Sequence, residues 1–314
     1  MSLVLGIDGG STKTVCVLMD STGQVLGRGE AGGSNYQSAG KEAAFDSIQL
    51  AIATAMESTE FGEVASICLG LAGVARPKDV QVAHSFIEHL GFKDAEIAVC
   101  HDALIALVGG LGHDVGIVAL AGTGSMVYGR NQQGRTQRVG GWGHVLGDEG
   151  SAYYIAVRGM QAAMRAYDGR SQPTILQQSL RHYLRLINLE DLVEIIYQRG
   201  WGVREIAAIA PIVDRAAASG DEVALGIIED AVQELALATQ RVIQGLFSTV
   251  DVCVVTGGSV WDGESQMRAR FAQAVTMLEP MAKVIPPQNE PAYGAALLAL
   301  DAIGKAQLGR YAHW

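Results

Sequence analysis

The chain has 314 residues, of which 49% are hydrophobic and 18% are charged, and its net charge is −10. These proportions are typical of a folded protein with a large core and exclude a mainly disordered chain. The acidic balance argues against general nucleic-acid binding. No apolar run is long enough to predict a membrane-spanning helix, and Asp8 interrupts the opening run, so we expect no signal peptide and a cytoplasmic protein.

The first third of the chain alternates between apolar strands and amphipathic helices, a pattern that predicts an α/β fold. The predicted strands cover residues 3–8, 15–20, 25–31, 64–73 and 95–100. The predicted helices cover residues 41–56, 79–91 and the segment that begins at Asp102.

One pattern occurs twice: an apolar strand, a loop of small residues, a second strand and a turn closed by glycine. Gly9 of the first copy aligns with Gly122 of the second, 113 residues later. We interpret the pattern as a duplicated fold unit. It predicts an N-terminal domain over 1–114 and a C-terminal domain over 115–314.

The remainder of the second domain is predicted to be mainly helical from 146 to 248, with single helices over 152–167 and 203–218 among its segments, and with a buried strand over 250–260. A last helix is expected over about 291–307 and starts with Pro291, a residue favoured at the first helical position. Its residues are nearly all small and apolar, so we expect it to pack closely on another element, with the N-terminal domain as one candidate.

Two loops that follow buried strands consist mainly of small residues. Their backbone N–H groups could therefore reach phosphate oxygens. Neither is a nucleotide P-loop, because Thr12 stands where that motif needs glycine before Lys13. An ordinary turn is the alternative for each loop. The loop residues are Gly9, Gly10, Ser11, Thr12 and Lys13, and Gly122, Thr123, Gly124 and Ser125.

Two aspartates end or follow predicted strands. Asp8 among phosphates would be repelled unless Mg²⁺, bound through water, lay between them; the alternative is an aspartate that caps a turn. Asp102 opens a helix and is either a helix cap or a general base.

Two further stretches carry candidate binding residues. Gly257 and Gly258 follow a buried strand and offer a bare surface for adenine or ribose, or form an ordinary turn. The stretch GGWGHVLGDEGSAYYIA over 140–156 combines exposed main chain, Trp142 and carboxylates, which suits a sugar. A packed loop capped by Asp148 is the alternative there.

The cysteines Cys16, Cys68, Cys100 and Cys253 all lie in or beside apolar runs, and no C-x-x-C motif occurs. Free cysteines are among the most buried residues, so we expect buried, reduced thiols.

The chain resembles the N-acetylglucosamine kinases, in the BadF/BadG/BcrA/BcrD-type ATPase family of the sugar kinase, heat-shock chaperone and actin superfamily. That family also holds glucosamine kinases and 2-hydroxyacyl-CoA dehydratase activators. The most specific matching segments are GGWGHVLGDEGSAY, HDALIAL, AGTGS and GGSVW. The five superfamily elements are matched in order by 5–14, 64–77, 119–125, 252–260 and 291–300.

The resemblance implies two duplicated actin-like, ribonuclease H-like domains with an ATP cleft between them, the second enriched in helices. It implies that the two loops bind the phosphates of ATP, that Gly257 and Gly258 bind adenosine, and that Asp8 positions Mg²⁺. Asp102 would be the base for the sugar 6-hydroxyl. The implied sugar-binding residues are Asn35, Gly73, Asp102, Gly141, Trp142, Gly143, Asp148 and Ala152.

The implied activity is ATP-dependent 6-phosphorylation of an amino sugar, with N-acetyl-D-glucosamine as the first candidate. Glucosamine and N-acetylmuramic acid are alternatives. The free ammonium group of glucosamine would need a further carboxylate in the site, which Glu149 could provide. The region 160–250 matches the family too weakly to carry residues over.

Two alternative functions belong to other classes of protein. A dehydratase activator would need exposed cysteines for an iron–sulfur cluster, whereas the cysteines here are predicted to be buried. A regulator or sugar sensor would not need Asp8 and Asp102, so the presence of both residues argues against this function. We expect a small-molecule substrate, no nucleic-acid or membrane partner, and a homodimer.

Overall fold

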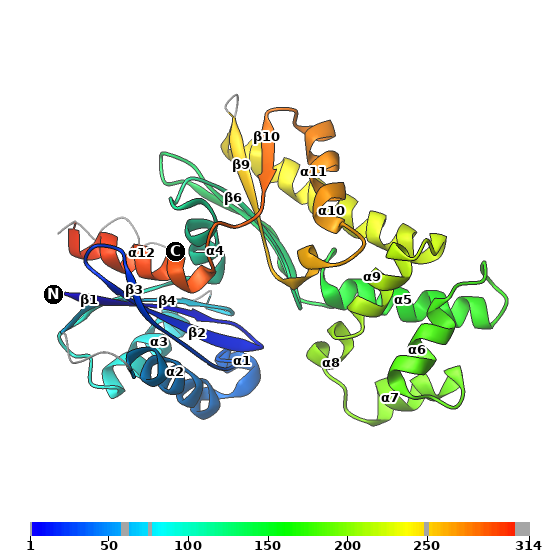
Figure 1. Ribbon diagram of the computed structural model, residues 1–314, viewed down its shortest axis with the longest axis horizontal. Coiled ribbons are helices and arrows are strands. Elements are labelled where there is room, and N and C mark those ends of the chain that lie inside the picture. Colours follow the sequence, from blue (N-terminus) through cyan, green and yellow to red (C-terminus); the bar gives the residue numbers. More distant parts are fainter. Residues whose placement is uncertain (1, 58–62, 75–76, 248–250, 305–314) are drawn as a thin grey trace. The chain divides into compact units, whose positions relative to one another are not determined.

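The computed structural model describes residues 2–57, 63–74, 77–247 and 251–304, and contains two five-stranded sheets (Figure 1). The chain divides into two compact units. Unit 1 comprises Met1–Val115, Gln132–Gly134 and Pro287–Trp314, and unit 2 comprises Gly116–Asn131 and Arg135–Pro286. The predicted ranges 1–114 and 115–314 differ from these units mainly in the described residues 287–304, which belong with unit 1.

The sheet of unit 1 has the strand order β3-β2-β1-β4-β5. The first three strands form antiparallel hairpins, and β1, β4 and β5 run parallel. All five strands predicted in this part of the chain are confirmed. The strands are β1 (Leu3–Gly9), β2 (Lys13–Asp20), β3 (Val25–Gly32), β4 (Val64–Leu71) and β5 (Glu96–His101).

Helices cover both faces of this sheet. Successive strand residues point to opposite faces, so Leu5 and Ile7 join a core with the helices α2 and α3, whereas Gly6 faces α12. The helices of unit 1 are α1 (Tyr36–Ala39), α2 (Lys41–Met56), α3 (Pro77–His89), α4 (Asp102–Leu111) and α12 (Pro291–Gly304). Residues 305–307 of the expected last helix lie outside the described residues, as do 75–76 and 250 of the two segments expected over 64–77 and 250–260.

Helix α12 packs very closely on β1 and α4 (Figure 1). A Cβ atom at Gly6 would lie 2.1 Å from the Ala296 nitrogen, and one at Gly294 would lie 2.1 Å from the Ile105 carbonyl oxygen. Both positions therefore require glycine, and the small residues of α12 serve this contact. Glu290, just before α12, also accepts two hydrogen bonds from Arg28 on β3, at 2.8 and 3.0 Å.

The sheet of unit 2 repeats this topology, with the order β10-β9-β6-β7-β8. Its first three strands again form antiparallel hairpins, and β6, β9 and β10 run parallel. Gly9 ends β1 and Gly122 directly follows β6, so the predicted duplication is confirmed in the strand topology. The strands are β6 (Gly116–Ala121), β7 (Ser125–Arg130), β8 (Thr136–Gly140), β9 (Val252–Gly257) and β10 (Ala282–Ile285).

The rest of unit 2 is helical, as predicted, with one difference. The residues 141–151 form a glycine-rich loop, and the first helix after it begins at Ala152, as predicted. The segment 203–218 is two helices rather than one: Pro211 lies in the first turn of the second, where its missing N–H costs nothing. The helices are α5 (Ala152–Tyr167), α6 (Leu176–Leu184), α7 (Leu192–Gln198), α8 (Val203–Ala207), α9 (Ala210–Ala218), α10 (Glu222–Leu246) and α11 (Met267–Leu278), with 3₁₀ turns η1 (Leu189–Asp191) and η2 (Ser259–Asp262).

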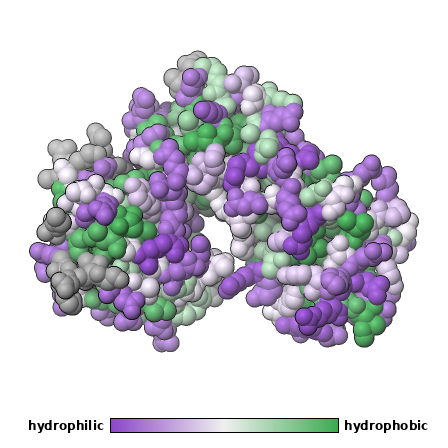
Figure 2. Space-filling model, in the orientation of Figure 1, coloured by the Kyte–Doolittle hydropathy of each residue, from purple (hydrophilic) through white to green (hydrophobic). Residues whose placement is uncertain are grey.

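Hydrophilic residues cover most of the face shown in Figure 2, with hydrophobic residues among them in the region of α6 and α7. Ile187 and Tyr197 belong to the exposed apolar residues of that region. Of the helices in the described part of the chain, none combines the length and apolar character that a membrane span needs.

Candidate active site

The first hairpin loop, between β1 and β2, is a tight turn with exposed polar side chains. The Gly10 N–H donates to the Lys13 carbonyl oxygen at 2.9 Å, and the Gly10 carbonyl oxygen accepts from the N–H groups of Ser34 and Asn35. The side chains of Ser11, Thr12 and Lys13 are exposed. The backbone thus holds the loop in place and leaves its hydroxyl and ammonium donors available for a ligand.

Two predicted sugar-binding residues of unit 1 lie beside this loop. The Asn35 amide nitrogen donates to Ser11 Oγ at 3.2 Å. Gly73 has φ +81°, and a Cβ atom there would lie 3.0 Å from Asn35 Oδ1. The structure therefore brings Asn35 and Gly73 together with the loop.

Asp8 lies at the end of β1 in an environment that disfavours its charge. Burial, and next the negative charge of Asp102, raise its pKa to about 7; Glu290 adds to the rise and Lys13 opposes it. A divalent cation would relieve this repulsion, and carboxylate oxygen is a ligand that Mg²⁺ prefers. The described residues include no ready group of three or more His, Cys, Asp or Glu ligands. Mg²⁺ at Asp8 would thus be completed by water and phosphate oxygens.

Asp102 is the first residue of α4, where the chain turns directly from strand to helix. The N-cap residue is His101, not Asp102, and the Ala103 N–H lies 3.1 Å from His101 Nδ1 and 2.8 Å from Asp102 Oδ1. His101 Nδ1 is also 2.6 Å from Asp102 Oδ1. A protonated Nδ1 would donate to the carboxylate and hold it in one orientation, and the Ala103 N–H would then donate to Asp102 Oδ1 instead of to the ring.

The two aspartates meet because β1, β4 and β5 are parallel. Asp8 is the last residue but one of β1, and Asp102 directly follows β5, so both lie at the same edge of the sheet, where α/β proteins commonly bind ligands. Asp102 is 25% exposed, which leaves its carboxylate accessible to a substrate hydroxyl. His101 and Glu290 were missed as members of this group, because neither a lone histidine nor a residue 188 positions later carries a local signal.

The second hairpin loop, between β6 and β7, is a turn of the same kind. The Gly122 N–H donates to the Gly124 carbonyl oxygen at 2.9 Å, and the Gly122 carbonyl oxygen accepts from the Ala152 N–H at 2.8 Å. Ser125 Oγ donates to the Glu149 carbonyl oxygen at 2.6 Å. The loop is therefore fixed to the start of α5.

Asp148 lies against this loop in a constrained conformation. It has φ +59°, an uncommon value for a residue with a side chain. Its Oδ1 accepts from the Gly143 N–H at 3.2 Å, and a Cβ atom at Gly124 would lie 2.9 Å from Oδ2. Burial raises the pKa of Asp148, and the hydrogen bond from Gly143 opposes the rise. The structure thus brings Gly143, Asp148 and Ala152 together with the loop at 122–125.

Gly257 and Gly258 have a structural reason to be small. Gly258 has φ +102°, and a Cβ atom there would lie 2.4 Å from the Ala121 carbonyl oxygen. The Trp261 indole N–H donates to the carbonyl oxygens of Gly257 and Ala119. The close approach of β9 to the loop after β6 accounts for these glycines without an adenosine.

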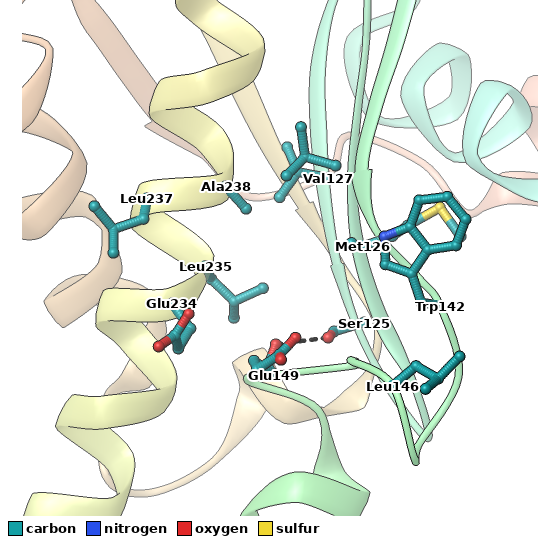
Figure 3. Close-up of a pocket in the computed structure, with 12 residues that line it drawn as sticks. Ser125, Met126, Val127, Trp142, Leu146, Glu149, Glu234, Leu235, Leu237 and Ala238 are labelled. Atoms are coloured by element: carbon teal, nitrogen blue, oxygen red, sulfur yellow. Dashed lines mark hydrogen bonds between the residues drawn. The ribbon is translucent and has the colours of Figure 1, made fainter.

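A cavity of about 360 Å³ lies between α10 and the strands β7 and β8 (Figure 3). Its lining includes Ser125, Trp142 and Glu149, and α10 contributes Glu234, Leu235, Leu237 and Ala238. Sequence reasoning missed these four α10 residues, because the amphipathic pattern of this helix indicates which residues are buried and not which ones line a cavity.

The two sheets share one topology, and each has a loop of small residues at the end of its first strand. This arrangement defines the actin-like sugar kinase fold. A solved structure of a putative N-acetylglucosamine kinase from Chromobacterium violaceum has a TM-score of 0.77 at 24% identity, over 96% of this chain and 99% of that one. A ROK family glucokinase from Streptomyces griseus, in complex with glucose and AMPPNP, has a TM-score of 0.60 at 19% identity, over 97% and 100%. The predicted fold class is confirmed.

Residues 5–299 match the model of the BadF/BadG/BcrA/BcrD ATPase family, and the chain belongs to that family. An N-acetylmuramic acid/N-acetylglucosamine kinase from Clostridium acetobutylicum is 36% identical over 304 residues, 95% of this chain and 98% of that protein. An N-acetyl-D-glucosamine kinase from Dictyostelium discoideum is 33% identical over 315 residues, 95% and 98%. The predicted family is confirmed.

Proposed function

We propose that this protein transfers the γ-phosphate of ATP to the 6-hydroxyl of an amino sugar, with N-acetyl-D-glucosamine as the substrate. The names of the relatives from Clostridium acetobutylicum and Dictyostelium discoideum both include this sugar. The family is one of ATPases. A cytoplasmic location, where ATP is available and thiols stay reduced, belongs to the same proposal.

The observation that carries the proposal is the pair of carboxylates, Asp8 and Asp102, at one edge of the unit 1 sheet. Asp8, whose pKa is raised by burial and by the charge of Asp102, suits a divalent cation. Asp102 is partly exposed and held by His101 at 2.6 Å. One carboxylate for a metal and another for a hydroxyl proton is the combination that phosphoryl transfer needs.

In this mechanism Asp102 accepts the proton of the sugar 6-hydroxyl while the sugar oxygen O6 attacks the γ-phosphorus of ATP. The new bond joins O6 to phosphorus, the bond from phosphorus to the β–γ bridging oxygen breaks, and ADP leaves. The loop at 9–13 and the loop at 122–125 would donate N–H and hydroxyl groups to phosphate oxygens. Mg²⁺, held through Asp8 and water, would neutralise phosphate charge.

Each unit contains residues that we propose as sugar contacts. In unit 1, Asn35 and Gly73 lie together beside Ser11. In unit 2, Trp142 is 65% exposed and offers an apolar surface to a sugar ring. Asp148, fixed by the Gly143 N–H, would accept hydrogen bonds from sugar hydroxyls. Gly141 and Ala152 complete this part of the proposed site, and Gly257 and Gly258 remain the proposed adenosine contact.

The burial of the cysteines disfavours an electron-delivering activator. Cys16, Cys68 and Cys100 are buried and Cys253 is half-buried, so the described structure offers no exposed thiol for a cluster. The Sγ atoms of Cys68 and Cys100 lie 3.8 Å apart within the sheet. These thiols are part of the unit 1 core.

The test is ADP release from Mg²⁺-ATP with N-acetylglucosamine, glucosamine, N-acetylmuramic acid, N-acetylmannosamine and glucose. The wild type and Asp102→Asn would be compared with Asp94→Asn, which removes an exposed carboxylate from the loop before β5. We expect turnover of an amino sugar that Asp102→Asn lowers by about 10²–10⁴-fold and Asp94→Asn leaves intact. Phosphorus NMR of the product would identify the 6-position. Absence of turnover on every sugar would refute the proposal.

A further inference from the structure

The guanidinium group of Arg138 on β8 lies over the indole ring of Trp142, with its central carbon 4.5 Å from the ring centroid. The neighbouring residue Gln137 approaches the Arg241 carbonyl oxygen of α10. Because adjacent strand residues point to opposite faces, Arg138 lies on the face away from α10. Figure 3 shows the Trp142 ring beside Met126 on that same side of the strands.

Arg138 is exposed, and within the described ranges no carboxylate lies at ion-pair distance from it. Arg28, Arg268 and Arg270, by contrast, all pair with carboxylates. The charge of Arg138 is therefore available to a ligand.

A guanidinium that stacks on an aromatic ring is oriented but keeps its N–H groups free in its own plane, where they can bind a carboxylate in a bidentate manner. Trp142 belongs to the loop proposed to bind the sugar, and its ring is largely exposed. A sugar near this ring would thus present its substituents to a positive, preorganised group.

We propose that Arg138 is a specificity-determining residue that binds a carboxylate carried by the amino sugar, so that acidic amino sugars are substrates together with neutral ones. The inference rests on the proposed kinase function. N-acetylmuramic acid has the required chemistry: an N-acetyl amino sugar with a carboxylate on an ether substituent. Glu149 and Glu234 lie on the α10 side of the strands (Figure 3), so they do not compete with the ligand for Arg138.

The experiment compares N-acetylmuramic acid, its methyl ester and N-acetylglucosamine as substrates of the wild type, Arg138→Gln and Arg138→Lys. The control is Arg135→Gln, which removes an equal exposed charge from the turn that precedes β8. For Arg138→Gln we expect kcat/KM for N-acetylmuramic acid to fall about 10-fold or more, mainly through KM, since a hydrogen bond to a charged group is lost. Arg138→Lys should recover part of that loss.

Activity on N-acetylglucosamine and on the ester should change less than about twofold in Arg138→Gln, because neither carries a carboxylate. Added salt should raise KM for the acid only, since exposed charges are screened. Equal losses on acid and neutral sugars would overturn the inference, because Arg138 would then act only through the position of Trp142. An unchanged KM for the acid would overturn it too. A wild type that phosphorylates N-acetylglucosamine but not N-acetylmuramic acid would overturn it and leave the proposed function intact, whereas inactivity on every sugar would remove both.

Discussion

Replacing Asp8 with asparagine should abolish activity and stabilise the metal-free protein at the same time. The carboxyl group has a pKa of about 7 in the folded chain against an ordinary value of 3.8, because of burial and the nearby charge of Asp102. Asparagine has a similar shape and carries no charge to bury. The Asp8 carboxylate, which is proposed to hold Mg²⁺, therefore lowers the stability of the folded protein when no metal is bound.

The sign and size of the effect follow from the two pKa values. Between pH 4 and 7 the unfolded chain releases the Asp8 proton while the folded chain keeps it, so the free energy of unfolding falls as the pH rises through this window. A difference of about 3 pKa units corresponds to about 4 kcal/mol. Asp8→Asn should therefore match the wild type near pH 4 and exceed it by up to about 4 kcal/mol at pH 8.

The assay is urea unfolding followed by circular dichroism from pH 4 to pH 8, with a chelator present. Asp20→Asn is a control of opposite sign: hydrogen bonds from Thr22 and Gln24 lower the pKa of Asp20, so that carboxylate stabilises the fold at neutral pH and less so as the pH falls. The reasoning would be refuted if the stability difference between Asp8→Asn and the wild type did not change with pH, or if the variant were the less stable protein at pH 8.

Three further predictions concern helices and the proposed base. Gly294→Ala should destabilise unit 1 by more than about 2 kcal/mol, as other overpacked cores do, because its Cβ atom would meet the backbone of α4 at 2.1 Å; thermal unfolding measures this, and an unchanged midpoint would contradict the described packing. Gly226→Ala should stabilise α10 by about 0.5–1 kcal/mol, since a Cβ atom there meets open space; a loss of stability would show a neighbour that the structure does not have. His101→Asn keeps a side chain that can cap α4 but removes the 2.6 Å contact with Asp102, so kcat should fall with little change in the melting temperature; an unchanged kcat would show that Asp102 needs no partner to orient it.

Much of the fold could be predicted because the strands of unit 1 carry long apolar runs and the hairpin pattern occurs twice. The elements that escaped prediction have weak local signals. β10 has only four residues and lies at the edge of its sheet, and α11 begins directly after a glycine-containing turn with charged residues in its first two turns. Pro211 divides a segment whose apolar spacing alone favours one helix.

The candidate site shows a similar division. Asp8 and Asp102 could be singled out because each follows an apolar strand. Their electrostatic coupling could not be predicted, since it depends on β4 lying between β1 and β5. His101 and Arg138 were missed for the same reason: one acts on a neighbouring carboxylate and the other on a ring four residues away, and only the folded backbone brings these groups into contact.

The packing of α12 on β1 has a consequence for biosynthesis. Gly6 emerges early from the ribosome, yet the helix that covers it, which includes Gly294 and Ala296, is among the last segments translated. Residues 116–131 and 135–286 can form unit 2 while β1 still lacks this cover. Unit 1 is thus the first unit to be synthesised and the last to be completed. Until α12 has been translated, the face of β1 that contains Gly6 stays uncovered, and its protection depends on delayed folding or on a chaperone.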